Sequence, residues 1–322
     1  MSRPRNLTEA ARLDGGAGSV STKRQRLAAD IASASQAETP YGQLVKTLDI
    51  QDFKFPYICP FALLWQLTQV SAGYAALLQS RIGDALGRVV LYVDEVVPGN
   101  NLRPDHARAF YSVFWLFLDY PDWLRSSAFG WHDLIVIKAS VCEEIRGGIS
   151  AVVACLLRVF WGTASGAYNM QTLGVRVASP QGDRVLRAEF CVFLVDERAE
   201  KFITGAKGSS GSKMCLSCRN VVGRIDPASV RPPFRHFSIP GLDGCEPQTV
   251  ATFNADLEYL RSQHGTVTAT EFRDMQQALG IAFDLNSLPY SDMRGYARIP
   301  ESRGSATGCT KCAPLAGLLN TK

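Results

Sequence analysis

Two acidic pairs, each placed directly after a run of apolar residues, could carry metal-dependent chemistry in this chain. Residues 89–93 form a β-branched run that is typical of a buried strand, and Asp94-Glu95 follows it. A second apolar run, residues 190–195, is followed by Asp196-Glu197. A buried carboxylate is costly unless it is hydrogen-bonded, paired or bound to a cation. Asp94 and Asp196, presented at one edge of a shared sheet, would form a site for Mg²⁺ or Mn²⁺.

Asp94 also has a purely structural interpretation. It could cap the segment that follows it, or form an ion pair with Arg88 or Arg103. Structural ion pairs also perturb carboxylates, as functional sites do. Both interpretations of Asp94 therefore remain open at the level of the sequence.

The cysteines favour a reducing compartment and a metal-binding role. There are nine of them, four in two Cys-x-x-Cys pairs, and no signal peptide is recognisable. We therefore expect an intracellular protein, nuclear or cytoplasmic. A closed zinc site needs four ligands, and the nearest set is Cys215, Cys218, His236 and Cys245. The alternatives are a redox pair, which the flanking residues do not favour, and inert buried thiols.

Charge is concentrated in two places although the net charge is only +4. Residues 1–26 hold six basic and two acidic residues, and residues 197–235 hold eight basic and three acidic ones. The second stretch is a candidate phosphate-facing patch, with Lys207, Lys213, Arg219 and Arg224 as nucleic-acid contacts and DNA as a possible partner. The alternative is an ordinary solvated surface.

The order of the expected elements predicts an α/β fold. We expect a disordered basic tail at 1–40, a helical region at 41–87, a core at 88–206, a Cys-x-x-Cys insertion with helices at 207–300 and a disordered tail at 301–322. Within the core, strands at 89–97, 109–119 and 134–140 precede a helix at 149–161, a hairpin turning at 180–183, a strand at 184–195 and a helix at 197–204. Strand–strand–strand–helix–strand is the order of an RNase-H-like mixed sheet with flanking helices.

Helices are also expected on either side of this core. The patterns predict helices at 41–48, 60–86, 252–263 and 270–279. Residues 55–80 carry no charge, but glutamines and prolines interrupt the run, so a buried amphipathic helix is favoured over a membrane span. We expect neither a membrane nor a small-molecule cofactor as a partner.

Three segments in a fixed order resemble a family of transposases. They are LYVDEVVPGN at 91–100, FWLFLDYPDWLR at 114–125 and FLVDERAEKFITGAKGSSGSKMCLSC at 193–218. This order is similar to that of CACTA-type or Kyakuja–Dileera–Zisupton-like DDE transposases, which are mobile elements of the dinoflagellate type. The resemblance implies an RNase-H-like nuclease and strand transferase in which three carboxylates hold two Mg²⁺ ions. Asp94 and Asp196 would be the first two carboxylates, and the Cys-x-x-Cys block would belong to a zinc-knuckle-like insertion.

The chain departs from the family at the third acidic residue. The family places it on a late helix near an aromatic-Met-His segment, and no such segment is found here. We therefore expect a truncated, catalytically incomplete relative. The competing hypothesis is a non-catalytic zinc-stabilised module that binds protein or nucleic acid. An enzyme with a nucleophilic Cys142 or Cys191 is disfavoured, because neither has an evident base nearby in sequence.

Overall fold

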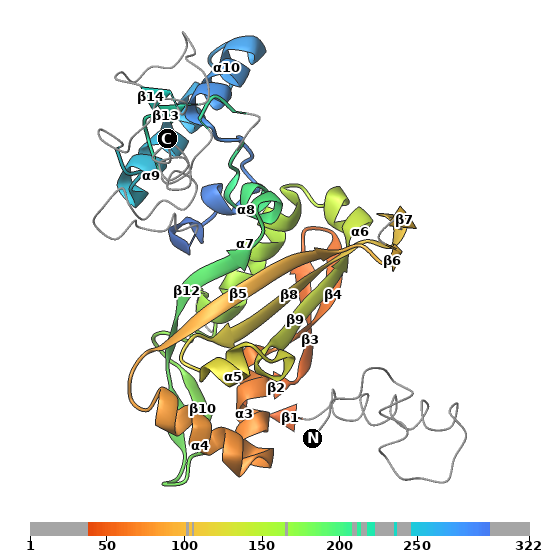
Figure 1. Cartoon of the computed structure of the whole chain (residues 1–322), viewed down its shortest axis with the longest axis vertical. Coiled ribbons are helices and arrows are strands. Elements are labelled where there is room, and N and C mark those ends of the chain that lie inside the picture. The colour runs from red at the N-terminus through yellow and green to blue at the C-terminus, as the bar shows by residue number, and fades with distance from the viewer. Residues whose placement is uncertain are drawn as a thin grey trace, which may run out of the picture.

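A six-stranded mixed sheet with helices packed against it organises the protein (Figure 1). The structure is a computed structural model, and it describes residues 38–296 apart from 101–102, 105, 165–166, 208–210, 214–217, 223–234 and 237–245. Of the tails expected at 1–40 and 301–322, residues 1–37 and 301–322 lie outside the described residues, whereas Glu38–Thr39 form a short strand. The sheet order is β12-β5-β8-β9-β4-β3. The strands are β3 (Val45–Ile50), β4 (Phe53–Ile58), β5 (Gly87–Val96), β8 (Phe110–Phe117), β9 (His132–Lys138) and β12 (Ala188–Val195).

All neighbours in this sheet are antiparallel except β12 and β5, which run parallel. The connection from β9 to β12 therefore has to cross over the sheet, and it does so through α7 (Gly148–Trp161). On the inner face of the sheet, Trp115 of β8 meets Phe160 of α7 with ring centroids 5.5 Å apart. Alternation sends Tyr92 and Phe114 to the opposite, outer face, where they are only half-buried.

Small elements complete the sheet body. Two-stranded pairs join β1 (Glu38–Thr39) with β2 (Gly42–Gln43), β6 (Gly99–Asn100) with β7 (Arg103–Pro104), and β10 (Val175–Val177) with β11 (Arg184–Leu186). The helices and 3₁₀ turns here are α3 (Pro60–Val70), α4 (Ala72–Arg81), η1 (His106–Arg108), α5 (Asp122–Arg125), η2 (Ala128–Gly130), α6 (Ala139–Glu144) and α8 (Glu197–Thr204). The hairpin predicted to turn at 180–183 is confirmed as the β10–β11 pair.

A second, smaller core follows α8. Phe253, Leu257 and Leu260 of α9 (Val250–Gln263) pack with Leu279 and Ile281, at and just after the end of α10 (Ala269–Leu279). The remaining elements are β13 (Val221–Val222), β14 (Arg235–His236), η4 (Leu288–Tyr290) and η5 (Arg294–Tyr296). Figure 1 shows α9 and α10 beyond the end of the sheet at which β12 finishes.

Two predictions for the N-terminal region are wrong. Residues 41–48 are not a helix: β3 and β4 form a hairpin that extends the main sheet past β9. Leu48 and Ile50 turn inward while Thr47 and Asp49 are exposed, which is strand alternation. The helix predicted at 60–86 is two helices, α3 and α4, because Ser71 is extended and caps α4 by accepting a hydrogen bond from the Tyr74 amide.

Candidate functional site

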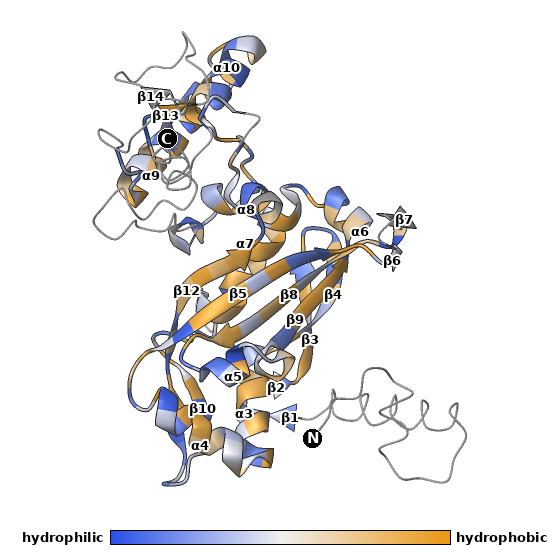
Figure 2. Ribbon diagram, viewed as in Figure 1, coloured by the Kyte–Doolittle hydropathy of each residue, from blue (hydrophilic) through white to orange (hydrophobic). Residues whose placement is uncertain are grey.

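Parallel pairing of β5 and β12 brings Asp94 and Asp196 to neighbouring positions. Val93 and Val195 are Cα partners in the ladder; Asp94 follows Val93 within β5, and Asp196 follows Val195 directly after the end of β12. Both carboxylates act on the same phenol, because the charges of Asp94 and Asp196 both contribute to raising the pKa of Tyr92. Figure 2 shows the ribbon of β5 turning from apolar to hydrophilic at this end.

One oxygen of each carboxylate is fixed by a hydrogen bond. Tyr92 Oη donates to Asp94 Oδ2 over 3.0 Å, and the Ala199 amide donates to Asp196 Oδ1 over 2.6 Å. Burial is the main cause of the raised Tyr92 pKa, followed by this bond to Asp94. The second oxygen of each aspartate makes no hydrogen bond within the described part of the chain. The pair is therefore oriented and retains two oxygens that could face a cation.

Asp196 has a capping role that the sequence analysis considered only for Asp94. Asp196 is the N-cap of α8, and the amide of Ala199 is the donor expected for such a cap. Asp94, however, does not pair with Arg88, whose guanidinium and amide both bond Asp119 at 2.7 to 2.9 Å. The side chain of Arg103 is not among those described. Capping does not by itself preclude cation binding, because it uses only one of the two oxygens of Asp196.

A third metal ligand is not in place. Among the residues with described positions, no group of three or more His, Cys, Asp or Glu side chains could hold a metal ion. Glu95 follows Asp94 directly, so alternation directs it to the other face. Divalent magnesium needs near-octahedral oxygen coordination, and two carboxylates would leave most positions to water or phosphate oxygens. The residues present fit a weak, incomplete cation site.

Backbone pairing involves two of the expected zinc ligands, Cys218 and His236. Val222 pairs with His236 in the β13–β14 ladder, and Cys218, which is buried, bridges to Pro247. His236 and Pro247 both follow the Cys-x-x-Cys block in sequence, so these pairings fold the chain after the block back towards Cys218. Cys215 and Cys245 lie outside the described residues, as do Cys309 and Cys312, and the His236 side chain is not described. The four-ligand zinc site remains a prediction.

The basic stretch divides into different environments. Lys213 is buried rather than presented to solvent: its Nζ donates to Gln248 Oε1 over 2.6 Å and lies 3.9 Å from Asp256 Oδ2. A phosphate could not reach this ammonium without breaking that contact, so Lys213 is removed from the expected DNA contacts. Lys207 and Arg219 are half-buried, and Arg224 lies outside the described residues.

Lys207 also lines a cavity of about 800 Å³ that the sequence did not reveal. The cavity lies between the α6–α7 turn, α8 and residues 282–287, and its charged lining residues are Glu143, Arg146, Lys201, Lys207 and Asp284. Gly147 and Gly148 both have positive φ at this turn, 88° and 52°. The sequence signal for this turn was the glycine pair before an apolar helix, because glycine adopts positive φ without the steric cost that other residues have.

A buried polar cluster was also missed. His132 Nε2 lies 3.2 Å from both Tyr74 Oη and Tyr120 Oη, and the two phenol oxygens are 2.5 Å apart. The imidazole packs on Trp115 with centroids 4.7 Å apart. Burial lowers the pKa of His132 to about 4, so the ring is neutral at physiological pH. The cluster lies under α4, away from the Asp94–Asp196 pair.

Neither sequence comparison gives a family. No family model matches the chain, and no curated protein matches it. In the described part of the chain no single helix is long and apolar enough to cross a membrane. Helices α3 and α4 taken together have sufficient length and apolar composition, but they are bent by 115° at their junction.

Proposed function

We propose that this chain is a DNA-associated protein derived from a DDE transposase, with an RNase-H-like core that is catalytically incomplete. The observation that carries the proposal is the adjacency of Asp94 and Asp196 at the ends of two parallel strands. The strand order β9-β8-β5-β12, with α7 as the crossover, supports the same fold, because it places the first strand of the core beside the last.

The site would hold Mg²⁺ or Mn²⁺ weakly through Asp94 and Asp196. A bound divalent cation would supply charge for a phosphate oxygen, which is the chemistry of phosphodiester cleavage. Tyr92 would keep Asp94 oriented, and the amide of Ala199 would do the same for Asp196. Without a third carboxylate, we expect cation binding without efficient DNA cleavage.

Terbium(III) luminescence tests the cation site. Tb³⁺ binds carboxylate oxygens as Ca²⁺ does, and Tyr92 with Trp131, at 5.6 Å, would sensitise its emission. We expect Asp94→Asn and Asp196→Asn each to weaken binding about tenfold, since each removes one charged ligand. Asparagine still accepts the bond from Tyr92 and still caps α8, so the fold is retained.

Asp133→Asn is the matched control for this titration. Asp133 lies on the same outer face, on β9, where Phe114 is its ladder partner. This substitution should leave the Tb³⁺ affinity unchanged. Equal affinities for wild type, Asp94→Asn and Asp196→Asn would exclude the carboxylate pair as a cation site.

The second candidate function is a zinc-stabilised binding module without metal-ion chemistry. The pairing of Val222 with His236 and of Cys218 with Pro247 supports it, because both pairings fold the chain that follows Cys218 back towards this cysteine. Metal analysis of the purified chain should find about one zinc per chain, which is the content of one four-ligand site. Cys218→Ser should lower the zinc content and Cys191→Ser should not.

DNA association is tested by a salt titration. If Lys207 and Arg219 contact phosphates, replacing either with alanine should reduce the slope of log affinity against log salt by about one. Lys54→Ala is the control, because Lys54 is exposed on β4 and forms an ion pair at 3.9 Å with Asp49, which is also exposed. No binding to DNA at low salt would favour a protein partner.

A further inference from the structure

An apolar patch on the outer face of the sheet lacks a cover from the described residues. We call Val192, Leu194, Tyr92, Phe114 and Trp131 the outer patch. Val192 is 40% exposed and Leu194 52% exposed. Leu194 is the ladder partner of Tyr92, and the Tyr92 ring lies 6.1 Å from Phe114 and 5.6 Å from Trp131. Contiguous exposed apolar surface of this kind marks a contact site.

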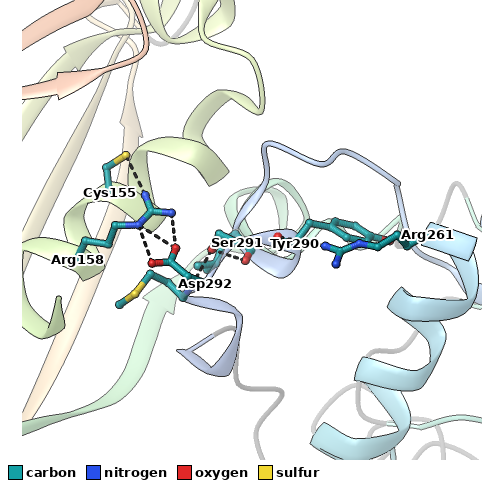
Figure 3. A network of polar contacts seen from close by, with 8 residues as sticks. Cys155, Arg158, Arg261, Tyr290, Ser291 and Asp292 are labelled. Carbon is teal, nitrogen blue, oxygen red and sulfur yellow. Dashed lines mark hydrogen bonds and ion pairs between the residues drawn. The ribbon is translucent and has the colours of Figure 1, made fainter. Parts of the chain in front are cut away.

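The described chain ends at β12, the edge strand that carries Val192 and Leu194, but on the inner face of the sheet. Tyr296 stacks on Trp161 at 5.4 Å and lies 5.9 Å from Phe190 of β12, two residues before Val192. Asp292 fixes the approach by pairing with Arg158 of α7, at 2.9 and 3.2 Å from Nε (Figure 3). The described chain therefore ends at Tyr296 on the inner side of β12, and a later segment would have to pass around this edge strand to reach the outer patch.

The strand edge itself is poorly suited to another strand. A bulge interrupts the register between Phe190 and Val192. At Ala188, the amide bonds the Met170 carbonyl and the carbonyl accepts from Trp161 Nε1, both at 3.0 Å. Bulges and satisfied backbone groups protect an edge from pairing with a second chain. We therefore expect a segment that covers the patch to pack through its side chains rather than to pair with β12 as an added strand.

Residues 297–322 contain one apolar segment that fits this requirement. Residues 313–319 read APLAGLL, and no charged residue interrupts them, whereas 300–312 are mostly polar or small. The chain between Tyr296 and this segment could span up to about 55 Å, so reach is no obstacle. We propose that residues 313–319 dock on the outer patch of the same chain and cover Val192 and Leu194.

Photocrosslinking of the full chain tests this proposal. Leu194 is replaced by benzoylphenylalanine, and the crosslinked peptides are identified by mass spectrometry in a mixture of ¹⁴N and ¹⁵N chains. We expect links from position 194 to residues 313–319 of the same isotope. Adding Leu318→Asp and Leu319→Asp should lower their yield by about tenfold or more, because leucine burial is worth at least that factor.

Leu173 is the matched control position, since it is 62% exposed and lies outside the outer patch. Benzoylphenylalanine at 173 should give no link to 313–319. The proposal is overturned if position 194 links only to the other isotope, links to residues 1–37, forms no link, or gives the same yield after the two aspartate substitutions. Links between isotopes would identify a second copy as the occupant.

Discussion

At the scale of single residues, the cluster of His132, Tyr74 and Tyr120 couples stability to pH. A neutral imidazole accepts a hydrogen bond at Nε2 from a tyrosine, and protonation would remove that acceptor inside an aromatic environment. The pKa of His132 is about 4 in the folded state and close to 6.5 when the chain unfolds. The unfolded state therefore takes up a proton first as the pH falls.

This order of protonation predicts acid lability. The stability contributed by neutral His132 is complete above pH 6.5 and is lost as the pH falls from there towards 4, by up to about 3 kcal/mol. Urea unfolding at pH 7.5 and at pH 4.5 measures the loss. His132→Gln, which keeps an acceptor but cannot protonate, should lose markedly less stability over this range. His264→Gln alters an exposed ring and should behave like wild type; equal losses in all three would contradict the prediction.

The sequence predicted the position of a functional side chain where that position depends on the residues next to it. The positions of Asp94 and Asp196 could be inferred because each directly ends an apolar run, and the ends of parallel strands meet at one edge. Lys213 could not be placed in this way. Its burial depends on Gln248 and Asp256, which are remote in sequence and contribute no local signal. The His132 cluster likewise needs α4 to lie across the end of β9.

At the scale of elements, Ser150 joins α7 to two others. Its hydroxyl donates to the Ile203 carbonyl of α8 over 2.7 Å and accepts from the Leu288 amide of η4 over 2.8 Å. Ser150 is 2% exposed, although it borders the cavity between α7 and α8. Ser150→Ala would leave two buried backbone groups unsatisfied, and we expect a loss of about 2–4 kcal/mol.

Denaturant unfolding of Ser150→Ala measures this loss. Ser126→Ala is its control, because the Ser126 hydroxyl also bonds a backbone carbonyl, that of Asp122, but does so at an exposed site. The control should change stability by less than about 0.5 kcal/mol. Similar values for the two variants would show that Ser150 is not a structural junction.

Most elements of the core could be predicted from periodicity, and the exceptions have physical causes. Helix α8 begins and ends at the predicted residues because Asp196 caps it and Gly205, at φ 69°, stops it. The β3–β4 hairpin was missed because its turn carries no glycine or proline. Gln51 takes the left-handed conformation instead, at φ 53°, and is held there by two hydrogen bonds to the backbone of Arg146.

At the scale of the whole molecule, the part of the chain that the structure describes has two separate apolar cores. Leu156 lies in the core between the sheet and α7, and Leu257 lies in the core of α9 and α10. Both are at most 1% exposed, so truncation to alanine should cost about 2–5 kcal/mol in either place. The elements that are destabilised should nevertheless differ between the two variants.

Hydrogen exchange would separate the two cores. Leu257→Ala should speed exchange in α9 and α10 and leave β5 and β8 protected, because few apolar contacts connect the cores. Leu156→Ala should speed exchange in the sheet. Faster exchange of β5 and β8 in Leu257→Ala, to the same extent as in Leu156→Ala, would mean that the chain unfolds as one cooperative unit.

The pairing of β5 with β12 has a consequence during synthesis. The ladder joins Gly87 to Ala188, so β5 can bond β8 early but has no neighbour on its other side until β12 emerges. At ordinary translation speeds, about a hundred residues take roughly 5–20 s. During that interval one side of the apolar strand β5 has no hydrogen-bonded neighbour. We therefore expect chaperone occupancy to be greatest on ribosomes stalled after β5 has emerged and before β12 has.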